Sequence, residues 1–322
     1  MVKLKDLVPL NLASEKEKFF ASLFKYNPQF IYEKKIDQQE LTRYGKPNLW
    51  YLFLAKRIIK KYQQVQSKQD DKLITSNQFL TQEEIEAFFT KRLSQYGLEK
   101  DYKIIFSKNF ISRVAINLKD KEVKILLPIK ISAQDIEAIL AHEIDTHVLR
   151  QYNYEQQIWF GKKKKYGFKE HLRTEEGLAI INEMISRQQP LAYKAAINYL
   201  ALNLALKKDF VSVFEFFYKM WQDPERSWTW TLKKKRGLTN TKQKGAYTKD
   251  IVYFEGLIKV LKYLRKNNYD PRPLYCGKID VDDLNKAINL QNNQAIKLPM
   301  FLQNNFEDYQ NKLKALCANH IY

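Results

Sequence analysis

Apolar positions along the chain recur mostly at the three- to four-residue spacing of amphipathic helices. This spacing predicts helices over 49–62, 81–97, 132–150 and 175–188, then over 191–220, 249–266, 280–290 and 302–317. Between residues 102 and 127 the pattern changes to short segments rich in Ile and Val, separated by Ser107-Lys108-Asn109 and Lys119-Asp120-Lys121. Short β-branched runs between turn-forming residues predict two or three strands of a small antiparallel sheet.

These elements indicate an α+β fold that is predominantly helical, with the small sheet placed just before the helix at 132–150. Gly and Pro number only 9 each, which favours long helices over extended loops. We expect residues 1–100 to form a helical part packed on a domain over 101–322. A single continuous domain is the alternative, since 322 residues suffice for either arrangement.

Composition and charge bear on the binding partners and the cellular compartment. Lys and Arg total 55 against 36 Asp and Glu, a net charge of +19. This surplus attracts nucleic acid, anionic membrane surfaces or acidic polypeptides, although a lysine-rich solvated surface gives the same total. Cys276 and Cys317 lie in no paired motif, which favours a reducing compartment. No apolar run spans a membrane, and Asp6 argues against a secretory signal, so we expect a cytoplasmic protein.

The chemistry is concentrated in the run Ala141-His142-Glu143-Ile144-Asp145-Thr146-His147, which holds two of the 4 histidines. A His-Glu pair followed by a second His on a helix is typical of zinc peptidases, in which two imidazoles bind zinc and the Glu acts on water. The usual spacing is four, but here it is 147 − 142 = 5. Positions five apart lie about 140° apart around an α-helix. A π-bulge would bring both imidazoles to one side; without one, they are ordinary helix residues.

A third ligand is predicted at Glu176, which lies 176 − 147 = 29 residues beyond His147 in the string Thr174-Glu175-Glu176-Gly177-Leu178-Ala179. Two His and one Glu from a following helix form an established catalytic zinc shell. The alternative is that both glutamates only complement the helix dipole. His171 is a less favoured substitute for Glu176 as a ligand.

The strings HEIDTH, the following Leu149-Arg150 and TEEGLA together resemble the tyrosine carboxypeptidase family, which includes a microtubule-associated tubulin detyrosinase and bacterial proteins known by a QEGLA motif. The string GAYTKD at 245–250, with Tyr253 and Gly256, is also similar, and Tyr26-Asn27-Pro28 matches more weakly. The resemblance spans roughly residues 20 to 300. Glu175 stands where the bacterial motif has Gln.

The resemblance implies a zincin-like, zinc-dependent carboxypeptidase, with its catalytic domain over 101–322, that removes a C-terminal Tyr or Phe. It assigns one zinc ion to His142, His147 and Glu176, and catalysis to Glu143. The partner would be a peptide or protein C-terminus, possibly an acidic tail. The oligomeric state is left open by the sequence.

Further residues are candidates for handling the substrate. Tyr253, or less favourably Tyr247, offers a hydroxyl for the developing oxyanion. A free carboxylate is best held by a bidentate cation, for which Arg236, Lys249 and Arg173 are available. An aromatic wall for the substrate side chain could be formed by Trp221, Trp228 and Trp230, although core packing is the simpler explanation for these residues. The lysines at 162–165 could steer an acidic substrate, although a solvated loop is the simpler explanation for them.

Three other functions fit parts of the sequence. A nucleic-acid-binding protein would explain the positive charge and the many aromatic residues, but the basic residues are spread along the chain. A zinc endopeptidase would share the metal motif. A peptide-binding protein without activity would share the fold, although the presence of Glu143 argues against it.

Overall fold

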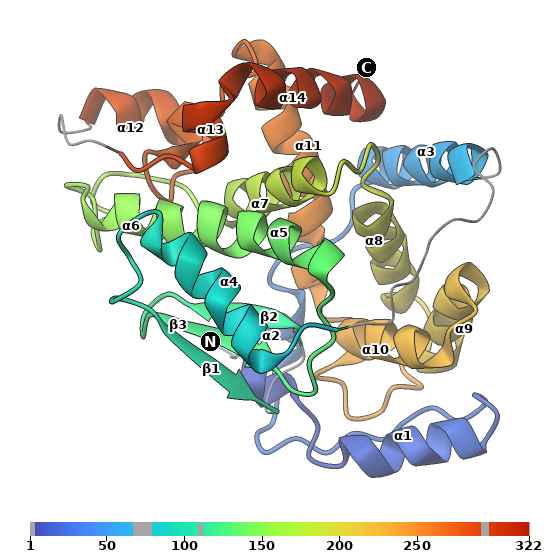
Figure 1. The fold of residues 1–322 in the computed structure, drawn as a ribbon. Helices are drawn as coiled ribbons and strands as arrows, with labels where there is room; N and C mark the ends of the chain where they lie inside the picture. The colour runs from blue at the N-terminus through green and yellow to red at the C-terminus, as the bar shows by residue number, and fades with distance from the viewer. Residues whose placement is uncertain (1–3, 67–78, 109–111, 291–295, 322) are drawn as a thin grey trace. The chain divides into compact units, whose positions relative to one another are not determined.

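The computed structural model describes residues 4–66, 79–108, 112–290 and 296–321 (Figure 1). Most described residues lie in helices, and one small sheet accompanies them, as the apolar spacing predicts. The chain divides into two compact units, each built from two stretches. The first unit comprises 1–64 and 193–254, and the second comprises 65–192 and 255–322. This division differs from the sequence-based one at residue 100, because helix 81–97 and the sheet belong to the same unit.

The first unit is helical and closes around aromatic side chains. Its core contains Phe19, Phe210 and Trp228, which contact one another edge-on or tilted. The helices begin where the sequence supplies caps: Asp209 and Asp223 each accept a hydrogen bond from a backbone N–H three residues on. Its helices are α1 (Leu12–Ala21), α2 (Gln38–Thr42), α3 (Leu49–Gln66), α8 (Tyr193–Ala205), α9 (Phe210–Trp221) and α10 (Pro224–Lys235), with 3-10 turns at Leu4–Leu7 and Thr248–Asp250.

The second unit places the sheet and α4 (Gln82–Ser94) beside the helices that carry the motifs. α4 begins with a capping box, in which the side chains of Thr81 and Glu84 bond each other's backbone N–H. α5 (Ala133–His142) packs against α7 (Leu172–Ser186), as Figure 1 shows in green. The other helices are α6 (Leu149–Glu155), α12 (Leu284–Leu290), α13 (Met300–Asn304) and α14 (Phe306–His320), with 3-10 turns at Arg272–Tyr275 and Val281–Asp283. α11 (Ile251–Lys266) contributes residues to both units.

The sheet corrects one prediction. Strands β1 (Lys103–Ser107), β2 (Val114–Asn117) and β3 (Glu122–Leu126) form a mixed sheet in the order β1-β3-β2, not an antiparallel one. β2 and β3 form the expected antiparallel hairpin, while β1 pairs in parallel with β3, with Lys103 opposite Glu122. The hairpin occupies one edge of β3, and β1 pairs with the other edge in the same direction as β3. Strand spacing alone does not distinguish these two arrangements.

The motif helix contains the predicted bulge. α5 continues into a π-helical turn at Glu143–Val148 and then into α6, without a break. Ile136, Ile144 and Val148 are buried along its apolar face, as their spacing predicts. β2 contacts the π turn, so the sheet lies against the part of the helix where the spacing widens.

No helix among the described residues combines the length and the apolar character that crossing a bilayer requires.

Candidate metal centre

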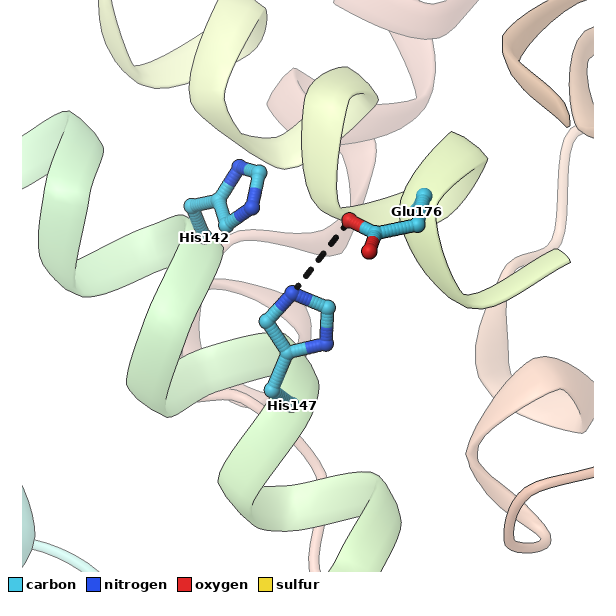
Figure 2. A group of neighbouring side chains, drawn as sticks. All are labelled: His142, His147 and Glu176. Atoms are coloured by element: carbon cyan, nitrogen blue, oxygen red, sulfur yellow. Dashed lines mark ion pairs between the residues drawn. The ribbon is translucent and has the colours of Figure 1, made fainter. Parts of the chain in front are cut away.

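Three side chains of the second unit converge at the π turn. The nitrogen or oxygen ligand atoms of His142, His147 and Glu176 all lie within 4.8 Å of one another. His142 precedes the π turn, His147 lies within it, and Glu176 comes from α7 (Figure 2). His147 Nε2 lies 3.8 Å from Glu176 Oε2, and the two imidazole centroids are 5.1 Å apart. The π turn therefore brings together histidines that a regular helix would separate.

The first histidine is oriented by an acid further along α7. Glu183 Oε2 lies 3.2 Å from His142 Nδ1. A carboxylate only accepts hydrogen bonds, so Nδ1 carries the proton and the Nε2 lone pair is left for a metal. Burial lowers the pKa of His142, but the bond to Glu183 and the charges of Glu143, Glu183 and Glu176 raise it to about 9. The surrounding carboxylates thus favour positive charge at this ring, which either a second proton or a cation at Nε2 supplies.

The second histidine is held by a buried ionic network. Glu175 Oε1 accepts from His147 Nδ1 at 3.0 Å, and Glu175 Oε2 accepts from Arg150 Nη1 at 2.5 Å. Arg150 is 0% exposed and Glu175 is 3% exposed. Burial raises the pKa of Glu175, but the charges of Lys278 and Arg150 and the bond to His147 hold it well below its usual value. Glu175 is therefore a carboxylate, and its bond to Nδ1 selects the tautomer in which a neutral His147 presents Nε2 to a metal.

Arg150 also fixes a distant part of the unit. Its Nε donates to the carbonyl of Leu274 and its Nη2 to the carbonyl of Ile279, both at 2.9 Å. Lys278 Nζ lies 3.4 Å from Glu175 Oε1. The segment 274–279 is thereby joined to His147 through the side chains of Arg150 and Glu175.

Glu143 differs from the other acids around the histidines. It is half-buried at the start of the π turn, next to His142. Within the described part of the chain, its carboxylate makes no hydrogen bond and no ion pair. Its charge acts on His142, where it helps to raise the pKa of that ring, so the carboxylate lies near the first histidine and has acceptor capacity to spare.

Two glycines set how closely α7 approaches α11. A Cβ added to Gly177 would lie 2.3 Å from the carbonyl carbon of Gly256, and one added to Gly256 would lie 2.1 Å from the carbonyl oxygen of Arg173. Only glycines permit this contact, which lies one residue from Glu176. Arg173 itself, half-exposed, donates from Nε to Glu255 Oε2 at 3.1 Å.

The remaining candidates for substrate handling belong to the first unit. These are Arg236, Tyr247, Lys249 and Tyr253, and their roles stay predictions. Of the tryptophans, Trp228 is a core residue at 3% exposure, while Trp221 stacks on Phe217 and lies 5.8 Å from Trp230. Packing therefore accounts for this cluster.

His171 has a different environment from the metal ligands. Its Nδ1 lies 2.9 Å from Lys163 Nζ and 3.3 Å from a Glu170 oxygen, and it lies outside the one candidate metal group found among the described residues. Burial lowers the pKa of Lys163 to about 8. Within the basic run, Lys162, Lys164 and Lys165 are exposed.

Sequence reasoning missed the residues that orient the histidines. Glu183 had a usable signal, because it follows Glu176 by 183 − 176 = 7 residues, two helical turns on the same face. Arg150 follows His147 by 150 − 147 = 3 residues and so lies near it on the helix. Its partners at 274 and 279 are backbone carbonyls, which leave no mark in a sequence.

Comparison with known proteins identifies the family of this chain. Residues 38–320 match the model of the family described as microtubule-associated tyrosine carboxypeptidase. Microtubule-associated tyrosine carboxypeptidase 1 of Homo sapiens is 27% identical over 321 residues, covering 98% of this chain and 67% of the human protein. The Mus musculus protein of the same name is 27% identical over 319 residues, with 98% and 68% covered. The Rattus norvegicus protein is 27% identical over 282 residues, with 86% and 60% covered. Since the family match covers most of its length, the chain belongs to the microtubule-associated tyrosine carboxypeptidase family.

Proposed function

We propose that this chain is a zinc-dependent carboxypeptidase that removes a C-terminal Tyr, or a Phe, from a peptide or protein. One observation carries the proposal: two histidines and a glutamate meet beside Glu143, an acid with no other partner among the described residues. Two imidazoles with one carboxylate form a donor set that suits zinc and leaves a coordination position open. The names of the relatives support the exopeptidase assignment and the aromatic terminus.

Each residue of the centre has its own role in the proposed reaction. Zinc bound by His142, His147 and Glu176 supplies a Lewis acid that acidifies water and polarises the peptide carbonyl. Glu143 accepts the proton of the attacking water and delivers a proton to the departing amine. Glu183 and Glu175 keep both imidazoles in the tautomer that presents Nε2.

Substrate handling is proposed for the residues that the sequence offers for it. Tyr253, or Tyr247, donates a hydroxyl to the developing oxyanion. Arg173 and Lys249 supply positive charge for the free terminus or for acidic residues before it. The net charge of +19 fits an acidic protein tail, and such a substrate would place the enzyme in the cytoplasm.

The test is mass spectrometry of a short acidic peptide ending in Glu-Glu-Tyr after incubation with the protein. We expect release of the terminal Tyr alone, at one zinc per chain by elemental analysis. A chelator and the variant Glu143→Gln should each abolish release, and Glu143→Gln should retain the metal, because Glu143 is not a ligand. A matched control is Glu170→Gln, an exposed acid outside the metal group, which should cleave normally.

The alternatives predict other products. Cleavage inside the peptide that is indifferent to a C-terminal amide indicates an endopeptidase. A zinc-loaded protein that cleaves no terminus refutes the carboxypeptidase proposal. Salt-dependent binding of generic RNA or DNA without cleavage would favour the nucleic-acid-binding alternative.

A further inference from the structure

Thr146 lies inside the π turn and closes it with its side chain. Its Oγ1 donates to the carbonyl oxygen of Ala141 at 2.8 Å, and the residue is 0% exposed. A threonine in a regular α-helix bonds the carbonyl three or four residues before it, but this carbonyl lies 146 − 141 = 5 residues before it. The bond therefore fits the wide turn and does not fit the α-helix that the wide turn replaces.

The span of this bond equals the separation of the two histidines. Ala141 directly precedes His142. Thr146 directly precedes His147, so the bonded pair and the two imidazoles are each five residues apart. Positions five apart in a regular α-helix lie about 140° apart around its axis. Because a π turn is rare, a side-chain bond that forms only in the wide turn shifts the balance towards the arrangement in which both imidazoles face Glu176.

Asn182 directs the hydroxyl of Thr146. Its Nδ2 donates to Thr146 Oγ1 at 2.7 Å and to the Tyr275 hydroxyl at 2.9 Å, and its Oδ1 accepts from the Tyr309 hydroxyl. All of these residues are at most 3% exposed. A hydroxyl has one proton, so a donor on one side of Thr146 Oγ1 leaves that proton for the carbonyl of Ala141.

The same amide joins the two helical segments that carry the metal ligands. Asn182 and Glu176 both belong to α7, whereas Thr146 belongs to the π turn. Burial raises the pKa of Tyr309 on α14 well above its ordinary value, so its hydroxyl keeps the proton and remains a donor. This bond fixes the amide in the orientation in which Nδ2 faces the π turn.

We propose that Thr146 and Asn182 are positioning residues, which hold the π turn at the width at which the two histidines bind one zinc ion. The inference rests on the proposed function and deepens it, because it assigns the geometry of the centre to two residues that are not metal ligands. Glu183 and Glu175 each orient one imidazole through its Nδ1. Thr146 and Asn182 instead set the spacing between the imidazoles.

The test compares Thr146→Val with Thr146→Ser. Valine keeps the shape of threonine and removes the hydroxyl, whereas serine keeps the hydroxyl. Zinc affinity is measured by competition with a chelator, and the coordination of the site by the visible absorption of the cobalt-substituted protein. We expect Thr146→Val to bind zinc roughly tenfold to a hundredfold more weakly than the parent, with an altered cobalt spectrum. Thr146→Ser should stay close to the parent in both measurements.

The matched control is Thr231→Val in the first unit. Thr231 is also 0% exposed, and its Oγ1 donates to a carbonyl of its own helix, that of Ser227, at 2.8 Å. This bond has the usual spacing of four residues, and α10 carries none of the three proposed ligands. We expect both valine variants to lower the melting temperature of the metal-free protein. Only Thr146→Val should change the zinc affinity and the cobalt spectrum.

Asn182→Ala tests the second residue, and it decides the matter if Thr146→Val does not fold. It keeps the Thr146 hydroxyl but removes the donor that directs it, so the zinc affinity should fall at least several-fold. The double variant should bind zinc no more weakly than the weaker of the two single variants, because both substitutions remove the same bond.

A folded Thr146→Val protein with the zinc affinity and the cobalt spectrum of the parent overturns the inference. So does a Thr146→Ser protein that is as impaired as the valine variant, or an equal loss of zinc affinity in Thr231→Val. Unchanged zinc affinity in Asn182→Ala overturns the role of Asn182. These measurements need no peptide cleavage. A parent protein that binds zinc but cleaves no peptide therefore refutes the proposed activity and leaves this inference standing.

Discussion

The pair Arg150–Glu175 gives the sharpest prediction, because both members are buried and each has further partners. The perturbations are Arg150→Met, Glu175→Gln and the double variant. Arg150→Met leaves the Glu175 carboxylate enclosed at 3% exposure, with Lys278 as its remaining cation at 3.4 Å. Removing one partner of a buried pair costs about 3–5 kcal/mol of unfolding free energy.

The single variant Glu175→Gln has a different cost. A neutral amide still offers one oxygen, but it cannot accept from both Arg150 and His147 through two oxygens, as the carboxylate does. One charged hydrogen bond is lost, which costs about 1–3 kcal/mol. In the double variant both charges of the pair are gone and Lys278 loses its carboxylate partner, so the loss should be close to that of Arg150→Met alone. The residual cost comes from the carbonyls of Leu274 and Ile279, which lose their donor.

The assay is urea unfolding of the metal-free proteins, since bound metal would add its own stabilisation. We expect a coupling free energy of about 1–3 kcal/mol between the two substitutions. The control is the ion pair of Arg43 with Glu40, whose side chains are both partly exposed. The coupling free energy between substitutions at these two residues should be less than about 1 kcal/mol. Losses for Arg150 and Glu175 that simply add, to within about 0.5 kcal/mol, would refute the view that the pair is one electrostatic unit.

Three further outcomes follow from the geometry. Glu183→Gln should weaken zinc binding roughly tenfold to a hundredfold, by competition with a chelator, because it loosens the first histidine. Gly256→Ala should lower the free energy of unfolding by about 1–3 kcal/mol, seen as a lower melting temperature, and should weaken zinc binding as well. The reason is that the added Cβ would lie 2.1 Å from the Arg173 carbonyl oxygen. An unchanged melting temperature would contradict the close contact of the two helices. Burial raises the pKa of Asp135, but the charges of Arg187 and Arg113 lower it below its ordinary value of 3.8. The ionised carboxylate therefore stabilises the folded protein above pH 3.8, and this stabilisation is lost as the pH falls through the pKa of the folded state. Asp135→Asn should therefore melt below the parent protein near pH 6 and close to it in strong acid, and an equal gap at both would refute the pairing.

Local chemistry explains what the sequence could predict. The five-residue separation of His142 and His147 permits one common face only if the helix widens, so the interpretation of both residues as metal ligands required the π turn. The capping box at Thr81 is equally local, since its two partners are three residues apart. The placement of Glu176 on the next helix agreed with a pattern of residue types and needed no knowledge of long-range packing.

Long-range choices were not predictable in the same way. The order and direction of the three strands depend on packing between distant parts of the chain. Short Ile- and Val-rich segments look alike in parallel and in antiparallel sheets. The position of Arg150 depends on carbonyls more than a hundred residues away. The division into units depends on where the chain returns after residue 192, and hydrophobic spacing describes helices without saying which ones pack together.

The π turn also carries a buried acid whose partners lie outside the motif helix. Asp145 is 0% exposed, pairs with Arg92 and accepts from the Tyr96 hydroxyl at 2.8 Å. Arg92 belongs to α4 and also bonds Glu137 on α5 at 2.5 Å. These bonds fix the position of the motif helix against α4. A shift or rotation of the motif helix by one residue would break them and would also misplace the two histidines. Substitutions in α4, which carries no metal ligand, should consequently behave as defects of the metal centre, and a search confined to the motif itself would overlook them.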